Sequence, residues 1–438
     1  MSPVSGISKF SALLSVCLIL GCAGILRAEA HTASPVGPVV LLSNPRPTPP
    51  AYFGLHVHHL AVAGPDGKLT AWPSIPFGSL RLWDAGCAWP NLEPRREEWD
   101  FKALDRYVAI ARRHRVQILL PLALTPAWAS SQPDQPSAYG PGEAAPPRSL
   151  ADWRNYVLKV ARRYKGQIHY YELWNEINSP RFYSGSMREM VELEKVAFQA
   201  LKSVDPDNQL VSPSMYGGGK SIQLLDKFFA DGGGRYADII GYHFYVAAQA
   251  PEAMVPLIGS VRNVMAQYGA ADKSLWNTET GWWIANTDGT PEHAGISAGW
   301  IRLQPEQAAA YVARALIIGR AAGLARFFWY AWDNQGMGLI NPTTQSLKPA
   351  ALAYARTMQW LSGKSIACQM SSATVACKLT PGTSWIIWSR SARGSSWVSP
   401  AGWRIARVTA LTGTESGVQR GGAIAVGDAP VRVNLVQQ

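Results

Sequence analysis

The 438-residue sequence predicts a (β/α)8 barrel followed by a small, sandwich-like all-β module, and three observations support this prediction. Eight strand-like runs alternate with stretches in which apolar residues recur at three- and four-residue spacing, the pattern of amphipathic helices. Carboxylates, amides, histidines and tryptophans gather where these strands end, which is where a barrel carries its active site. Beyond Leu361, short β-like runs separated by glycine and serine replace the alternation. The alternation alone also fits an open doubly wound sheet, but the strand count and the placement of the polar residues favour the barrel.

The expected elements follow the chain in order. Strands are expected at Tyr52–His58, Ser79–Asp84, Gln117–Leu124, His169–Glu176, Gln209–Met215, Asp238–Tyr245, Ser274–Gly281 and Arg326–Asp333. Helices are expected at Phe101–His114, Leu150–Tyr164, Met187–Val204, Ala253–Tyr268, Gln304–Ala322 and Pro349–Leu361. We therefore assign residues 51–362 to the barrel and residues 31–50 to an extended lead-in rich in proline, serine and valine. The β module takes residues 363–438, with strands at Ser365–Leu379, Ser384–Ser389, Trp403–Leu411 and Val431–Val436.

The first 30 residues have the pattern of a targeting segment. Lys9 precedes an uncharged run, Phe10–Leu26, and Ala28-Glu29-Ala30 offers a small-x-small cleavage site. The run is also compatible with a retained membrane anchor, and Ile19-Leu20-Gly21-Cys22 resembles a bacterial lipobox that would place a lipid on Cys22. All three routes predict an exported protein that is periplasmic, attached to the cell envelope or secreted.

Composition and cysteine usage narrow the class of protein. Charged residues make up only 16% of the chain and apolar residues 47%, so a large core can form. Cys368 and Cys377 flank a hairpin-sized stretch and would pair in an oxidising compartment, although two free thiols also fit the sequence. The sequence contains no Cys-x-x-Cys motif and so does not indicate a zinc site of that kind. We expect no metal or other cofactor.

The chain is basic, with a formal net charge of +11. The basic residues are dispersed, which fits solvated helix faces or attraction to an anionic polymer or envelope surface. No nucleic-acid recognition motif is present in the sequence, so we expect no nucleic-acid partner. We expect a monomer whose partner is a polysaccharide or oligosaccharide, with membrane attachment through the N-terminal segment left open.

Two of the predicted strands end on glutamates in similar surroundings. The fourth runs into Trp174-Asn175-Glu176 and the seventh into Glu279-Thr280-Gly281-Trp282. Glycosidic bond cleavage needs one protonated carboxyl group for the leaving oxygen and one ionised carboxylate that attacks the anomeric carbon. Aromatic rings suit sugars because the weakly positive C–H groups of a pyranose stack on the ring face. The sequence therefore predicts a sugar-cleaving site at this end of the barrel.

These motifs resemble those of the retaining glycoside hydrolases of clan A, and within it of family 39 and the Psl-type exopolysaccharide glycosidases of bacterial envelopes. The resemblance covers residues 50–360 and includes His243-Phe244-Tyr245 between the two glutamates. It implies that Glu176 is the acid/base and Glu279 the nucleophile of a retaining β-glycoside hydrolase. The resemblance also implies a bacterial exopolysaccharide as substrate. The number of aromatic residues at the strand ends favours cleavage within the polymer over trimming from one end. The departure is Ile177, where many relatives have proline, so we expect a different loop shape there.

The resemblance also assigns residues that contact the substrate or the nucleophile. Asn175 would bond the sugar 2-hydroxyl, Tyr245 would donate to the nucleophile, and His243 would line the same pocket. Arg81 would lie beneath the nucleophile and lower its pKa. The remaining expected substrate contacts are Trp282 and Trp332 as the floor of the sugar site, with His58 and Trp128 at other strand ends.

Two alternative functions remain open from the sequence. His56-Val57-His58 on the first strand is typical of metal-dependent amidohydrolase barrels, in which Glu176, His243 and Asp333 would be further ligands. The fifth strand, however, ends in Ser212-Pro213-Ser214 and offers no histidine to that set. The other alternative is a non-catalytic polysaccharide-binding barrel, which would not need both glutamates.

Overall fold

The computed structural model describes residues 39–292, 295, 299–417 and 422–437. The targeting segment expected at residues 1–30 therefore lies outside the described residues. Within the described part of the chain, the helices are all too short or too polar to span a bilayer.

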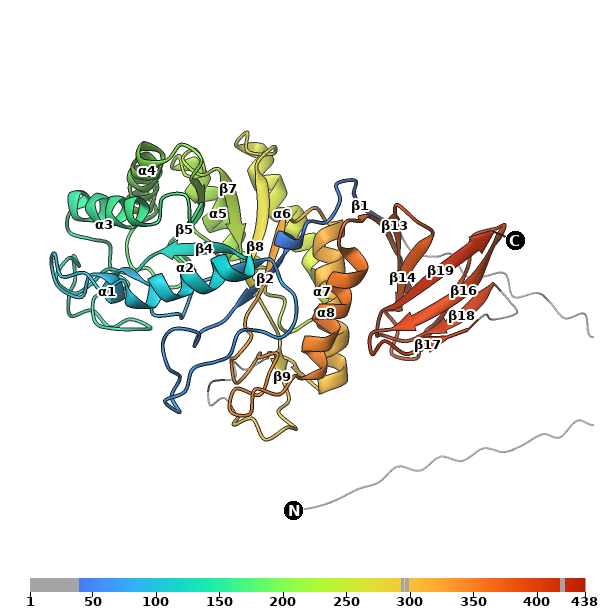
Figure 1. Ribbon diagram of the computed structural model, residues 1–438. Helices are drawn as coiled ribbons and strands as arrows, with labels where there is room; N and C mark the ends of the chain where they lie inside the picture. The colour runs from blue at the N-terminus through green and yellow to red at the C-terminus, as the bar shows by residue number, and fades with distance from the viewer. Residues whose placement is uncertain (1–38, 293–294, 296–298, 418–421, 438) are drawn as a thin grey trace, which may run out of the picture. The chain divides into compact units, whose positions relative to one another are not determined.

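A closed barrel of eight parallel strands forms the larger part of the structure, as the sequence predicts (Figure 1). Its strands, in the order in which they neighbour one another, are β11 (Arg326–Trp329), β2 (Phe53–His56), β3 (Ser79–Arg81), β4 (Gln117–Leu122), β5 (Tyr170–Leu173), β6 (Gln209–Val211), β7 (Ile239–Tyr242) and β8 (Ser274–Thr280). Each strand is shorter than predicted, because residues at its carboxyl end leave the hydrogen-bonded ladder. Some of these residues line the site described below: Trp83, Asp84, Asn175, Glu176, Tyr245 and Tyr330.

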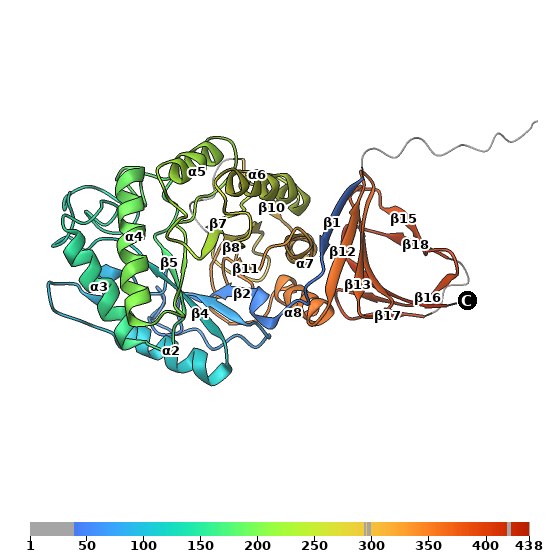
Figure 2. The same ribbon diagram turned by 90° about the horizontal axis from the view of Figure 1, so that it is seen from above.

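Helices surround the barrel (Figure 2). They are α1 (Trp89–Leu92), α2 (Lys102–His114), α3 (Leu150–Arg163), α4 (Met187–Val204), α5 (Lys220–Ala230), α6 (Met254–Gln267), α7 (Pro305–Ala321) and α8 (Pro349–Leu361), with short 3-10 helices η1 (Pro50–Tyr52) and η2 (Pro251–Ala253). The Ser186 side chain accepts a bond from the Glu189 amide and so caps α4. The sequence prediction missed α5, which follows three glycines and has no side-chain cap.

At the amino ends of the strands, an apolar cluster and the buried Arg326 side chain, which donates to the Ser79 hydroxyl, fill the barrel interior. Leu119, Val211, Ile239, Trp276 and Phe328 form a buried cluster there. The packing is close enough that a Cβ on Gly54 would come within 2.4 Å of the Phe328 ring. This plug closes the bottom of the barrel, so the open space lies at the carboxyl ends of the strands.

The C-terminal module is built on a seven-stranded antiparallel sheet with the order β1-β12-β13-β14-β19-β16-β17. Its strands are β1 (Val40–Asn44), β12 (Ser365–Met370), β13 (Thr374–Thr380), β14 (Ser384–Ser389), β19 (Val431–Gln437), β16 (Trp403–Ala410) and β17 (Glu415–Ser416). A second pair, β15 (Ser395–Val398) and β18 (Ala423–Val426), completes it, while β9 (Trp283–Ile284) and β10 (Arg302–Leu303) pair in the barrel loops. Cys368 and Cys377 are paired across β12 and β13 and joined by a disulfide.

Two features join the module to the barrel. The lead-in contributes β1, which pairs with β12 and so brings the chain segment before the barrel into the module sheet. A buried network also crosses the boundary: Glu252 in η2 accepts hydrogen bonds from Arg314 on α7 and, at 2.7 Å, from the Trp388 indole on β14. The module is therefore anchored to the barrel through buried polar contacts as well as packing.

Candidate active site

The two glutamates come from strands on different sides of the barrel mouth. Glu176 follows β5, and Glu279 lies near the end of β8, three strands further round the closed sheet. Because all eight strands are parallel, their carboxyl ends open at the same face of the barrel. His243 and Tyr245 follow β7, which neighbours β8, so all four side chains can converge on one space.

The backbone around Glu176 explains how β5 ends. Trp174 and Glu176 both take left-handed conformations, with φ of 54° and 44°, which L-residues other than glycine seldom adopt. The Trp174 ring is fully buried, and its indole donates to the Phe182 carbonyl at 2.7 Å. This anchor holds the turn, so that Asn175 and Glu176 face the mouth of the barrel. Strained backbone of this kind is characteristic of functional sites.

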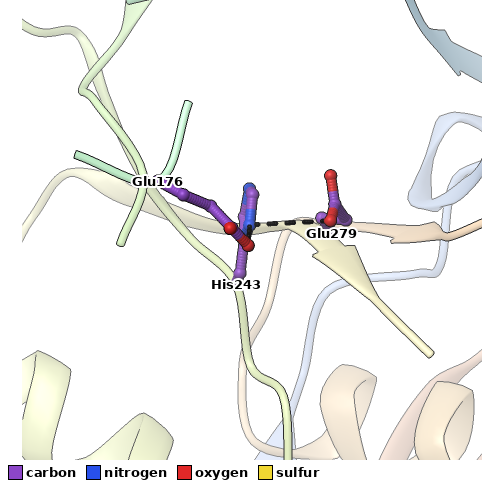
Figure 3. A group of neighbouring side chains, drawn as sticks. All are labelled: Glu176, His243 and Glu279. Atoms are coloured by element: carbon purple, nitrogen blue, oxygen red, sulfur yellow. Dashed lines mark hydrogen bonds and ion pairs between the residues drawn. The ribbon is translucent and has the colours of Figure 1, made fainter. Parts of the chain in front are cut away.

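The carboxylates of Glu176 and Glu279 face one another with the His243 ring beside them (Figure 3). One side-chain donor or acceptor atom from each of Glu176, His243 and Glu279 lies within 4.8 Å of the other two. In retaining glycosidases the two carboxyl groups are about 5 Å apart, whereas inverting enzymes separate them further to admit a water molecule. The spacing here therefore corresponds to the retaining arrangement.

Arg81 on β3 bonds to three side chains at the floor of the site. Its fully buried guanidinium donates to Glu172 at 2.5 Å, to Glu279 at 2.9 Å and to the Asn175 carbonyl oxygen at 2.8 Å. Glu172 lies on β5 below Glu176 and serves as a structural counter-charge. Because the side-chain oxygen of Asn175 accepts this bond from Arg81, its side-chain NH2 group can donate to a ligand in the cavity.

The surroundings of Glu176 and Glu279 affect the pKa of each carboxyl group differently. Burial, together with the nearby charge of Glu279, raises the pKa of Glu176 well above its ordinary value. Burial also raises the pKa of Glu279, to about 7, while the charge of Arg81 and the Tyr245 hydroxyl, which donates to Glu279 at 2.9 Å, act to lower it. Arg81 and Tyr245 thus favour the ionised form of Glu279, whereas burial and the charge of Glu279 favour the protonated form of Glu176, which suits a nucleophile and an acid respectively.

His243 has a different position from the one the resemblance implies. It is fully buried behind the carboxylates, with Nδ1 3.0 Å from Glu176 Oε1 and 3.9 Å from Glu279 Oε1. Burial, reinforced by the charge of Arg81, holds the pKa of its imidazole well below the ordinary value, so the ring is neutral. His243 therefore orients Glu176 rather than lining the sugar pocket.

A cavity of about 510 Å³ lies over the two glutamates and is mostly aromatic. Its lining residues are Trp83, Asp84, Ala138, Tyr139, Asn175, Glu176, Phe182, Tyr216, Tyr245, Glu279, Trp300 and Tyr330. A second cavity, of about 440 Å³, adjoins it because it shares Trp83, Asp84 and Tyr139. A third, of about 500 Å³, adjoins it on another side and shares Tyr216, Tyr245 and Trp300. The binding space thus extends in two directions from the catalytic pair.

Four other expected sugar contacts lie away from this cavity. Trp282 is fully buried between the barrel wall and α7, stacked on Trp329, because it points outward from the end of β8. Trp332 is likewise buried in the core after the chain leaves β11. His58 lines a separate hollow beside Asp333, and Trp128 donates to the Glu93 carbonyl and lies under the Arg96 guanidinium. These four expectations are corrected by the structure.

The aromatic residues that do line the cavity were mostly missed. Tyr139, Phe182 and Trp300 come from loops, where no strand end marks them in the sequence. Tyr216 directly follows the strand predicted at Gln209–Met215, which is a signal that could have identified it. Tyr330 directly follows β11, so its position at a strand end is the signal that could have identified it.

The ligand set of a metal-dependent amidohydrolase does not assemble in this structure. The Asp333 carboxylate accepts bonds from the backbone amides of His58 and His59 and from the Thr70 hydroxyl, which occupy its oxygens. Glu176, His243 and Glu279 are close enough to share a cation. However, the Arg81 guanidinium already bonds Glu279 and supplies positive charge at that position.

Comparison with known sequences finds a family and a relative that this chain resembles. The family model of glycosyl hydrolases family 39 matches residues 84–317, more than half of the chain. A β-xylosidase of Geobacillus stearothermophilus is 28% identical over 126 residues, which is 27% of this chain and about a quarter (24%) of that relative.

Solved structures share the fold. A family 39 glycoside hydrolase from Bacteroides cellulosilyticus WH2 superposes with a TM-score of 0.67 at 19% identity, covering 89% of this chain and 81% of its own. A monomeric β-xylosidase from Caulobacter crescentus CB15 superposes with a TM-score of 0.58 at 16% identity, and the match covers 82% of this chain and 90% of that one. A glucosidase from Croceicoccus marinus also superposes with a TM-score of 0.58, at 14% identity, and the match covers 91% of this chain and 98% of that one.

Proposed function

Because this chain belongs to family 39 of the glycosyl hydrolases, we propose that it hydrolyses β-glycosidic bonds with retention of anomeric configuration. Glu279 is the nucleophile and Glu176 the acid/base. The observation that carries the proposal is the approach of the two carboxylates, with Glu176, His243 and Glu279 offering atoms within 4.8 Å of one another. That spacing suits direct attack by a carboxylate on the anomeric carbon and leaves little room for a water molecule between the two groups.

The reaction proceeds in two displacements. The Glu279 carboxylate forms a bond to the anomeric carbon while the bond from that carbon to the leaving oxygen breaks, and Glu176 gives its proton to that oxygen. Glu176, now ionised, then takes a proton from a water molecule that attacks the same carbon and releases Glu279. Arg81 and Tyr245 hold Glu279 in place for both steps through hydrogen bonds of 2.9 Å each.

The substrate is a polysaccharide cleaved within the chain. The support for this is the pair of additional cavities that adjoin the catalytic one, toward Asn91 and Glu143 on one side and toward Leu257 and Ser260 on the other. Sugars on both sides of the scissile bond then have space to bind. Phe182, Trp300 and other aromatic rings in the lining offer stacking surfaces.

A bacterial exopolysaccharide is the proposed polymer, on the strength of the sequence resemblance and the targeting pattern of residues 1–30. That pattern also supports export to the periplasm, the envelope or the medium. The β-xylosidases among the relatives suggest a second candidate activity, release of single sugars from chain ends. The sizes of the products distinguish the two activities.

The test is a panel of polysaccharides and xylo-oligosaccharides assayed for new reducing ends, with the products separated by size. We expect the wild type to cleave one of them and the Glu176→Gln and Glu279→Gln variants to lose activity by about 100-fold or more. Glu192→Gln, the same change at an exposed position on α4, is the matched control. Retention of most of the wild-type rate in the Glu279 variant contradicts the mechanism, and release of monosaccharides alone contradicts internal cleavage.

A further inference from the structure

The binding space has the opposite charge to the chain as a whole. Although the chain carries a net +11, the ionisable side chains that line the catalytic cavity include three acids: Asp84, Glu279 and the proton donor Glu176. The adjoining 440 Å³ cavity shares Asp84 and adds Glu143. Among the described residues that line these two cavities there is no lysine, arginine or histidine. A negatively charged sugar would meet no counter-charge on these walls.

Asp84 stands at the junction of the two cavities in a fixed orientation. Its Oδ1 accepts the Tyr139 hydroxyl at 2.5 Å, and its Oδ2 accepts the Tyr330 hydroxyl at 2.6 Å. Its backbone is left-handed, with φ of 54°, a conformation that aspartate and asparagine tolerate better than most residues. A carboxylate can accept about four hydrogen bonds. Each Asp84 oxygen accepts one from a tyrosine hydroxyl and can therefore accept another.

Asp84 also acts on the catalytic pair from this position. Its negative charge contributes to the raised pKa of both Glu176 and Glu279. A group whose charge reaches both glutamates lies close to the sugar that Glu279 attacks. The second cavity continues beyond Asp84, away from the third cavity, so Asp84 separates the attacked sugar from the next unit on that side.

We propose that Asp84 is the specificity-determining residue for the attacked sugar. It accepts hydrogen bonds from hydroxyl groups of a neutral sugar and excludes one that bears a carboxylate. This inference rests on the proposed function, because it presumes that a sugar is attacked by Glu279. A carboxylated sugar would place a second negative charge against Asp84 in a space where no lining side chain neutralises it. Like charges held together at a binding site lower affinity by about 100-fold or more.

Three aryl glycosides test the proposal: the 2,4-dinitrophenyl β-D-xyloside, β-D-glucoside and β-D-glucuronide. Their rings have the same configuration and differ only at carbon 5, which carries hydrogen, a hydroxymethyl group or a carboxylate. We expect the wild type to react about 100-fold faster with the better neutral glycoside than with the glucuronide. Asp84→Asn keeps the side-chain shape and tolerates the same backbone, and should narrow this ratio at least tenfold.

Two further variants separate charge from structure. Asp272→Asn makes the same change at an exposed position before β8, at the opposite end of the strands, and should leave the ratio unchanged. Tyr139→Phe removes one hydrogen bond to Asp84 but keeps its charge, and should preserve the preference for neutral sugars. Thermal melting of each variant reports whether the fold is intact.

The outcomes distinguish this proposal from the proposed function. If the glucuronide reacts as fast as the neutral glycosides, or if Asp84→Asn leaves the ratio unchanged, the specificity proposal is overturned. The proposed function survives either result when turnover still requires Glu279. If none of the three glycosides reacts faster with the wild type than with Glu279→Ala, the specificity proposal is overturned, while the proposed function is decided by the polysaccharide panel.

Discussion

Arg81 and Glu279 form a buried ion pair at the bottom of the catalytic cavity, with guanidinium Nη1 2.9 Å from carboxylate Oε2. The same guanidinium holds Glu172 and Asn175, so one side chain connects β3, β5 and β8. The pair keeps the nucleophile fixed and favours its ionised form against the effect of burial.

Replacing Arg81 should therefore impair both ionisation and folding. In Arg81→Gln the guanidinium no longer lowers the pKa of Glu279, so this pKa should rise. The acidic limb of the pH–activity profile should then move to higher pH. The free energy of unfolding should fall by about 3–5 kcal/mol, because two buried carboxylates lose their counter-charge. Arg81→Lys keeps the positive charge and should leave the acidic limb nearer its wild-type position, although kcat falls. An acidic limb in Arg81→Gln that matches the wild type would show that the ion pair does not control ionisation.

The pH profile of the wild type should be bell-shaped. Activity needs Glu279 ionised and Glu176 protonated. Burial raises the pKa of Glu279 to about 7, and burial and the charge of Glu279 raise the pKa of Glu176 well above its ordinary value. As the pH rises, kcat/KM should increase through about 7 and then decrease where Glu176 loses its proton; both limbs belong to the coupled pair. The measurement is kcat/KM from pH 5 to 10, with Glu176→Gln expected to lose the alkaline limb. A maximum near pH 5 would be incompatible with this electrostatic account.

His243 should affect the general acid and leave sugar binding unchanged. His243→Phe removes the nitrogen that lies 3.0 Å from Glu176 Oε1, so Glu176 would no longer be held toward the leaving oxygen. We expect kcat/KM to fall about tenfold on substrates with poor leaving groups and much less on dinitrophenyl glycosides, which need no proton.

His243→Asn places an amide near the position of Nδ1 and should recover part of the loss. Equal losses on good and poor leaving groups would mean that His243 only supports the fold. Inhibition by the product sugar should be the same in all three proteins, since the ring is buried behind the carboxylates.

The anchor between module and barrel should contribute to stability and have little effect on catalysis. Trp388→Phe removes the indole that donates to Glu252 at 2.7 Å, which should lower the free energy of unfolding by about 1.5–3 kcal/mol. Trp385→Phe, the same change three residues earlier on β14 at a partly buried position, is the matched control and should cost less. The measurements are chemical denaturation and kcat/KM. An unchanged stability for Trp388→Phe would show that the network is not a significant anchor.

The sequence predicts the part of the site that belongs to the strands. Alternation of elements predicted all eight strands, and strand ends predicted the two glutamates. The family resemblance added Asn175, Tyr245 and Arg81, and the structure brings all five side chains together. These residues are predictable because parallel strands in a closed barrel place their carboxyl ends at one face.

The loops and the direction of side chains limit what the sequence can predict. Strand alternation places Asn277 and Glu279 on the same face. Trp282, three residues after Glu279, faces the opposite way toward Tyr311 on α7. Tyr139 and Trp300 reach the cavity from loops whose paths no periodicity describes. The pairing of β1 with β12 was likewise hidden, because it joins residues more than 300 positions apart.

The most direct measurement for the catalytic assignment is covalent trapping with a 2,4-dinitrophenyl 2-deoxy-2-fluoro-β-glycoside of the sugar that the enzyme cleaves. The fluorine slows both displacements, while the activated leaving group keeps the first fast enough for the glycosyl-enzyme to accumulate. Mass spectrometry of the digested protein should locate one added sugar on the peptide that contains Glu279, with no label in Glu279→Gln. A label on any other residue, or turnover with inversion and no adduct, would contradict the assignment of Glu279 as the nucleophile.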